Sequence, residues 1–144
     1  MQVTGLRTVI FACTRNAGRS QMAAAFFNAL ADPRAATAVS AGTRPAERVH
    51  ATVADAMGEV GIDVSGARPR KLTQEMAAGA SLLVTMGCGE ECPFVPGLER
   101  DDWPVPDPEN RPMVEVRAIR DEIRERVRTL VDDRGWSRQI VPDA

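Results

Sequence analysis

The chain alternates between short, mostly apolar runs and longer segments in which apolar residues recur at helical spacing. The runs at residues 7–12, 37–40 and 82–86 have the length and β-branched content of buried strands. Helical spacing follows the first two runs, over residues 20–30 and 49–60, and is clearest over residues 116–130. This alternation predicts an α/β fold, with a parallel sheet and helices on both of its faces.

Local signals refine these boundaries. Thr73 is expected to be the N-cap of a short helix over residues 74–78 that ends at Gly79. Residues 87–112 show no helical pattern, and we expect a short fourth strand at Asp102-Trp103. Glu122 and Arg126 are spaced to form an ion pair on the exposed face of the last helix.

Composition limits the classes of function. A chain of 144 residues with 44% hydrophobic and 26% charged content is typical of one soluble domain, which we expect to span residues 1–144. A net charge of -2 argues against nucleic acid or an anionic membrane as the main partner. No signal peptide or transmembrane stretch is evident, so we expect a cytoplasmic protein. Three cysteines, an odd number, in a reducing compartment favour catalytic or redox-active thiols over a structural disulfide.

The segment that joins the first strand to the first helix carries the candidate chemistry. We call residues 13–19 the Cys13 loop; it begins at Cys13, ends at Arg19 and encloses Thr14-Arg15-Asn16-Ala17-Gly18. In a strand–loop–helix unit, the loop N–H groups and the helix N-terminus converge on one point and bind an anion there. A nucleotide-binding loop would carry Gly-Lys-Ser or Gly-Lys-Thr instead of a thiol and a guanidinium.

Four side chains in or next to this loop have roles suited to oxyanion chemistry. The helix N-terminus and Arg19 favour the nucleophilic thiolate form of Cys13. The planar Arg19 fork can hold two oxygens of a tetrahedral anion. Ser20 is placed to donate a hydrogen bond to the sulfur, and Asn16 tolerates the left-handed backbone that curls the loop. A buried structural cysteine near a surface arginine is the simpler alternative, but the enclosed spacing favours a nucleophile.

Cys88 follows the third strand as Cys13 follows the first. Because ligands bind beyond the carboxyl ends of parallel strands, both thiols are expected at the same edge of the sheet.

Residues Cys13 to Ser20, followed by Gln21-Met22-Ala23, resemble the phosphate loop of low-molecular-weight protein tyrosine phosphatases and of the arsenate reductases that share their fold. The resemblance implies a four-stranded parallel sheet flanked by helices, a covalent cysteine intermediate, and an acid from a late Asp-Pro pair. It continues in four further segments: Ser40-Ala41-Gly42-Thr43, Gly61-Ile62-Asp63-Val64-Ser65, Thr85 to Pro93, and Trp103 to Pro108.

Asp107 fits the role of that acid. Pro108 biases Asp107 towards an extended backbone, and a carboxylic acid beside the oxyanion would protonate the departing oxygen. Spacing alone does not separate this role from a turn, because Asp-Pro is a common turn signal.

Two features distinguish a reductase from a phosphatase within this resemblance. The chain has no tyrosine, and Glu109 follows Pro108 where the phosphatases usually place an aromatic residue. Cys88 and Cys92 are two further thiols that hydrolysis does not require. In arsenate reduction, Cys88 would attack the sulfur of Cys13 to release arsenite, and Cys92 would then attack Cys88.

An external dithiol, thioredoxin in the first instance, would reduce the Cys88–Cys92 disulfide. A low-molecular-weight thiol with a glutaredoxin-like partner is the alternative donor. Arsenate reductases of this fold usually have a longer spacer between the later cysteines than the three residues found here.

Other readings are a phosphatase that hydrolyses phosphate monoesters through Cys13, and a non-catalytic oxyanion or redox sensor. Cys13, Cys88, Cys92 and His50 form a conceivable zinc set, but their spacing is not that of a zinc knuckle, so we expect no metal and no cofactor. His50 is expected near the start of the second helix without a chemical role. Some relatives bind potassium with residues that match Asn16, Ser40 and Asp63 here, together with a glutamate. Ala24 replaces that glutamate in this chain, which argues against a potassium site. We expect a monomer.

Overall fold

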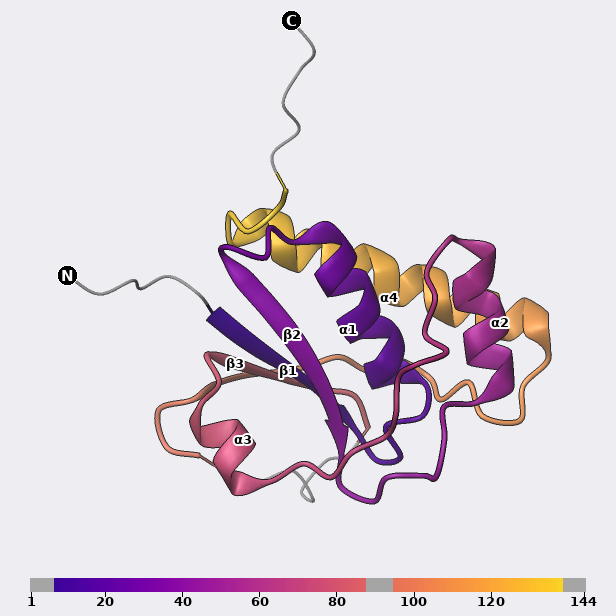
Figure 1. The fold of residues 1–144 in the computed structure, drawn as a ribbon, viewed down its shortest axis with the longest axis horizontal. Helices are drawn as coiled ribbons and strands as arrows, with labels where there is room; N and C mark the ends of the chain where they lie inside the picture. Colours follow the sequence, from indigo (N-terminus) through magenta and orange to yellow (C-terminus); the bar gives the residue numbers. More distant parts are fainter. Residues whose placement is uncertain (1–6, 88–94, 139–144) are drawn as a thin grey trace, which may run out of the picture.

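A computed structural model describes residues 7–87 and 95–138 of the chain. Its centre is a sheet of four parallel strands, as expected, and the strand order is β2-β1-β3-β4 (Figure 1). The strands are β1 (Arg7–Cys13), β2 (Ala36–Gly42), β3 (Leu82–Thr85) and β4 (Glu99–Asp102). The helices are α1 (Arg19–Leu30), α2 (Ala51–Glu59), α3 (Gln74–Ala78) and α4 (Met113–Asp133).

The helices cover both faces of the sheet, which confirms the prediction (Figure 1). On one face α1 and α4 pack together, and α2 packs against α4. On the other face α3 contributes Met76 to a smaller apolar cluster with Ile10 and Leu83. The alternation along β1, where Val9 and Phe11 face the larger core and Ile10 the smaller one, explains why this run is continuously apolar.

The fourth strand begins and ends earlier in the sequence than predicted. β4 covers Glu99–Asp102, so Asp102 belongs to it and Trp103 follows it. All four residues of β4 are exposed at the sheet edge and charged, so they carry no hydrophobic pattern. Charges on an edge strand discourage pairing with another chain, which is a reason for this composition.

Trp103 anchors the segment after β4 to the core. Its ring centroid lies 5.6 Å from that of Phe11, and Phe11 in turn makes an edge-on contact with Phe27 on α1. The Trp103 backbone N–H also donates to Thr85 O over 2.8 Å. These contacts fix the start of the segment that leads to Asp107.

Two further predicted signals are confirmed. Thr73 Oγ1 accepts a hydrogen bond from Met76 N and caps α3, and Arg126 Nε donates to Glu122 Oε2 on α4. Within the described ranges, none of the helices combines the length and apolar character that crossing a membrane requires.

Candidate active site

The Cys13 loop is held from outside by its carbonyl groups. Each carbonyl from Cys13 to Gly18 accepts a hydrogen bond. By contrast, no hydrogen bond in the described part of the chain has a backbone N–H of residues 14–18 as its donor. The loop therefore has the polarity of an anion-binding nest, with its N–H groups available to a ligand. The donors, in loop order, are Thr43 N, Arg44 N, Ala46 N, Gln21 Nε2, His50 N and Met22 N.

A buried polar network surrounds the sulfur of Cys13. Ser20 Oγ lies 2.9 Å from Cys13 Sγ and accepts a hydrogen bond from Asn16 Nδ2 over 2.7 Å. Since the serine hydroxyl has one proton and accepts from Asn16, that proton is available to the sulfur. Asn16 Oδ1 accepts from Gln21 Nε2 and Arg70 N, and Asn16 has the expected left-handed backbone, with φ at 52°.

Arg19 begins α1 and is held over the same loop. Its Nη1 donates to Val105 O over 3.0 Å, and its Nη2 lies 3.6 Å from Asp107 Oδ2. Arg19 Nε is buried and has no hydrogen-bond partner among the described residues. A buried, unpaired donor of a charged group is costly, and an oxyanion at the loop would satisfy it.

The Asp107-Pro108 pair is docked on the Cys13 loop. A Cβ atom added at Gly18 would lie 2.9 Å from Pro108 Cγ, so the proline ring rests where only a glycine leaves room. The Asp107 carboxylate, 46% exposed, accepts a hydrogen bond from Glu109 N. The structure therefore brings Asp107 to the Cys13 loop, beside Arg19.

Cys88 and Cys92 lie outside the described residues. The residue before Cys88 is described: Gly87 O accepts a hydrogen bond from Thr14 Oγ1 over 3.3 Å. Gly87 also lies against the Arg19 guanidinium, since an added Cβ would be 2.6 Å from Nη1.

Two residues that sequence reasoning did not place in the site belong to it. Val105 binds Arg19 through its backbone carbonyl, a contact that no side-chain pattern reveals. His50 was expected at the start of the second helix, and it does precede α2. Its side chain also lies beside Gly18, and a ring nitrogen comes within 4.8 Å of carboxylate oxygens of Asp107 and Glu109.

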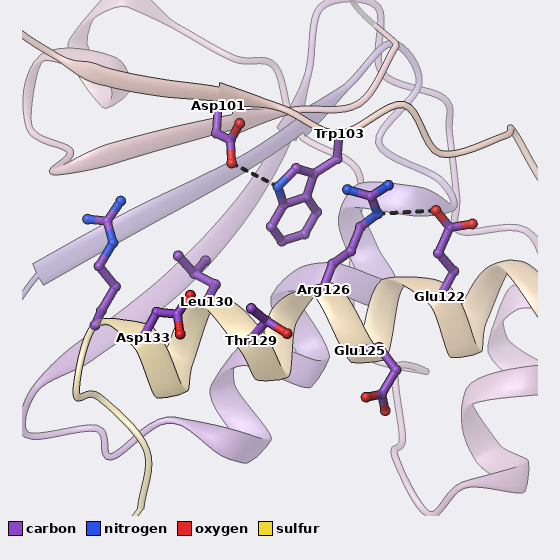
Figure 2. Close-up of a pocket in the computed structure, with 9 residues that line it drawn as sticks. Asp101, Trp103, Glu122, Glu125, Arg126, Thr129, Leu130 and Asp133 are labelled. Carbon is purple, nitrogen blue, oxygen red and sulfur yellow. Dashed lines mark hydrogen bonds and ion pairs between the residues drawn. The ribbon is translucent and has the colours of Figure 1, made fainter.

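The structure also has a groove of about 530 Å³ away from the Cys13 loop, between β4 and α4 (Figure 2). Trp103 faces it, with its indole N–H donating to Asp101 and the Arg126 guanidinium 6.0 Å from its ring centroid. None of the residues lining this groove belongs to the Cys13 loop: Asp101, Trp103, Glu122, Glu125, Arg126, Thr129, Leu130, Asp133 and Arg134.

Comparison with known proteins defines the class. The sequence profile described as "Low molecular weight phosphotyrosine protein phosphatase" matches residues 8–139. A putative arsenate reductase of Halobacterium salinarum is 36% identical over 127 residues, covering 85% of this chain and 89% of that protein. A glutaredoxin arsenate reductase of Synechocystis sp. is 33% identical over 129 residues, covering 88% of this chain and 97% of that protein.

A solved structure gives the same fold. The thioredoxin-dependent arsenate reductase of Corynebacterium glutamicum superposes with a TM-score of 0.79 at 33% identity, over 92% of this chain. This chain spans 63% of the length of that one.

The fold and the comparisons together define an enzyme of the phosphatase-like α/β class. The chain belongs to the low molecular weight phosphotyrosine protein phosphatase family.

Proposed function

We propose that this chain is an arsenate reductase that works through Cys13, Cys88 and Cys92. The observation that carries the proposal is the position of Gly87, in contact with both Thr14 and Arg19. Gly87, which immediately precedes Cys88 in the sequence, therefore lies against the loop that holds Cys13. The relatives named arsenate reductases support the choice of substrate.

The first step is capture and attack. The loop N–H groups and Arg19 bind the oxygens of arsenate. The Cys13 thiolate forms a sulfur–arsenic bond, and one oxygen leaves as water after Asp107 supplies a proton. Ser20 stabilises the thiolate by donating a hydrogen bond to the sulfur.

The second step reduces the arsenic. The Cys88 thiolate attacks Cys13 Sγ, a disulfide forms, and the electron pair of the sulfur–arsenic bond stays on arsenic, which leaves as arsenite. The Cys92 thiolate then attacks Cys88 Sγ and releases the Cys13 thiolate. A dithiol protein of the thioredoxin type reduces the Cys88–Cys92 disulfide; a glutaredoxin-coupled thiol is the alternative donor.

The second candidate is hydrolysis of phosphate monoesters. Cys13, Arg19 and Asp107, the last two 3.6 Å apart, would suffice for a phosphoenzyme mechanism, in which water hydrolyses the sulfur–phosphorus bond of S-phosphocysteine at Cys13 and releases phosphate and the thiolate. Cys88 and Cys92 have no role in that reaction. Whether the reaction requires Cys88 and Cys92 therefore distinguishes arsenate reduction from phosphate monoester hydrolysis.

The test is arsenate-dependent NADPH oxidation with thioredoxin and thioredoxin reductase, followed by mass mapping of the disulfides. We expect turnover with arsenate, none with phosphate, and none for Cys13→Ser, Cys88→Ser or Cys92→Ser. Cys88→Ser and Cys92→Ser should still hydrolyse a small aryl phosphate, and this hydrolysis is the matched control for folding. Normal turnover by Cys92→Ser would refute the relay. Rapid phosphotyrosine hydrolysis without arsenite, with thioredoxin or with glutathione and glutaredoxin, would establish the phosphatase.

A further inference from the structure

We propose that His50, Asp107 and Glu109 form a binding site for a divalent first-row transition-metal ion at the mouth of the Cys13 loop. One ligand atom from each residue lies within 4.8 Å of the ligand atoms of the other two. An imidazole nitrogen with two carboxylate oxygens is a ligand set that suits zinc, cobalt and iron(II).

The fold brings these ligands together from two separate segments. His50 is fixed by its backbone N–H, which donates to Ala17 O over 3.0 Å, and its ring lies beside Gly18. Asp107 is fixed from the other side, because Pro108 packs on the same Gly18. His50 and the two carboxylates therefore belong to separate segments of the chain, and both segments pack on the same residue, Gly18.

The ligand atoms are available for coordination. Within the described ranges, the His50 ring and the Glu109 carboxylate make no hydrogen bond or ion pair. Asp107 Oδ2 is 3.6 Å from Arg19 Nη2, which is longer than a hydrogen bond, so this oxygen keeps lone pairs for a metal. His50 and Asp107 are half-buried and Glu109 is exposed, so the three side chains are open to an ion from solvent.

A bound ion would affect catalysis in a defined direction. A metal ion coordinated by the Asp107 carboxylate would occupy the oxygen that the proposed acid needs to carry a proton to the leaving group. This consequence rests on the proposed role of Asp107, whereas binding itself does not. The site would thus make the enzyme sensitive to inhibition by transition-metal ions.

The binding test is a titration of the reduced full-length protein with Co²⁺, followed by visible absorption in phosphate-free buffer. Coordination by nitrogen and oxygen gives weak d–d bands, whereas coordination by Cys13, Cys88 or Cys92 gives intense sulfur-to-cobalt bands in the near ultraviolet. We expect only the weak bands. Loss of one ligand in His50→Ala or in Glu109→Gln should weaken binding at least about tenfold. Glu75→Gln, which removes an exposed carboxylate on α3, is the matched control and should bind like the parent.

Unchanged affinity in both ligand variants, or intense sulfur-to-cobalt bands, would overturn the site. Hydrolysis of an aryl phosphate with a poor leaving group is then measured with and without Co²⁺, each variant being compared with its own metal-free rate. We expect Co²⁺ to inhibit the parent and Glu75→Gln, and to inhibit the two ligand variants only at correspondingly higher concentration. Binding without inhibition would count against Asp107 as the acid and leave the metal site standing.

Discussion

The guanidinium group of Arg19 lies directly against the backbone of Gly87. A Cβ atom at Gly87 would be 2.6 Å from Arg19 Nη1 and 3.1 Å from Cζ, and Gly87 has a left-handed backbone with φ at 88°. Thr14 holds the carbonyl of Gly87 from the other side. The proposed oxyanion clamp, the Cys13 loop and the residue that precedes Cys88 are therefore one packed unit.

Gly87→Ala should impair the binding of oxyanions. The added methyl group must displace the guanidinium, so we expect phosphate to inhibit at a concentration raised by about tenfold or more, as for a lost charged hydrogen bond. Arsenate turnover should fall as well, because Arg19 is the proposed clamp for the arsenate oxygens. The measurements are phosphate binding by calorimetry and turnover with thioredoxin.

The control for Gly87→Ala is Gly97→Ala. Gly97 has nearly the same φ, at 84°, but an added Cβ would meet no atom within 4 Å. Both variants carry the strain of an alanine in the left-handed region, and only Gly87→Ala has the clash. Equal effects of the two variants on phosphate binding would show that the contact with Arg19 is unimportant.

Ser20→Ala should slow the attack by Cys13. The hydroxyl lies 2.9 Å from the sulfur, and a hydrogen bond to a charged group contributes about 1.5–3 kcal/mol. If that bond stabilises the thiolate, kcat/KM for an aryl phosphate should fall by about tenfold to a hundredfold. Ser81→Ala, at the opposite end of the sheet, should leave the rate unchanged. A Ser20→Ala rate equal to that of the parent would exclude this hydrogen bond from the mechanism.

Asp107→Asn should lower kcat much more for substrates with poor leaving groups than for substrates with good ones. An acid that protonates the departing oxygen contributes about 10²- to 10⁴-fold, and only where the leaving group needs a proton. We expect a large loss of kcat with an alkyl phosphate and a small one with p-nitrophenyl phosphate. Asparagine retains the oxygen that accepts from Glu109 N, so the turn should persist. A uniform loss with both substrates would make Asp107 a structural residue, and Asp55→Asn on α2 serves as the neutral comparison.

The sequence predicts the parts of this molecule that follow a local pattern. The apolar run before Cys13, the cap at Thr73 and the pair of Glu122 with Arg126 are decided by neighbours in the chain, and the structure confirms all three. The fourth strand was predicted too late in the sequence, because an exposed edge strand of charged residues has no hydrophobic pattern that would mark its bounds.

Contacts between distant segments could not be predicted in this way. The carbonyl of Val105 binds Arg19 across 86 positions of the sequence, and any residue type could supply a carbonyl. His50 reaches Asp107 and Glu109 only because the segments on either side of Gly18 converge. The Cys13 loop was recognisable from its residue types; the groups that orient it required the fold.

Glu59 links α2 to α4 and makes stability depend on pH. Its carboxylate accepts hydrogen bonds from Arg117 and from Arg120, which together hold the pKa of Glu59 below its ordinary value of 4.5. A carboxyl group whose pKa is lowered by folding stabilises the folded state above the unfolded value, and this stabilisation is lost as the pH falls through the folded value. Glu59→Gln should therefore lower the urea midpoint at pH 7.

The difference between Glu59→Gln and the parent should start to shrink as the pH falls below about 4.5, where Glu59 becomes protonated in the unfolded parent. It should vanish only below the lowered pKa of the folded parent, where the folded chain also carries a neutral side chain at this position. Urea unfolding followed by circular dichroism between pH 7 and pH 3.5 measures both chains. Glu47→Gln removes an exposed carboxylate that forms no ion pair in the described part of the chain, so its midpoint should follow that of the parent at every pH. If the urea midpoint of Glu59→Gln stays below that of the parent by the same amount across this pH range, the loss comes from packing between α2 and α4. The charge of Glu59 would then contribute nothing to stability.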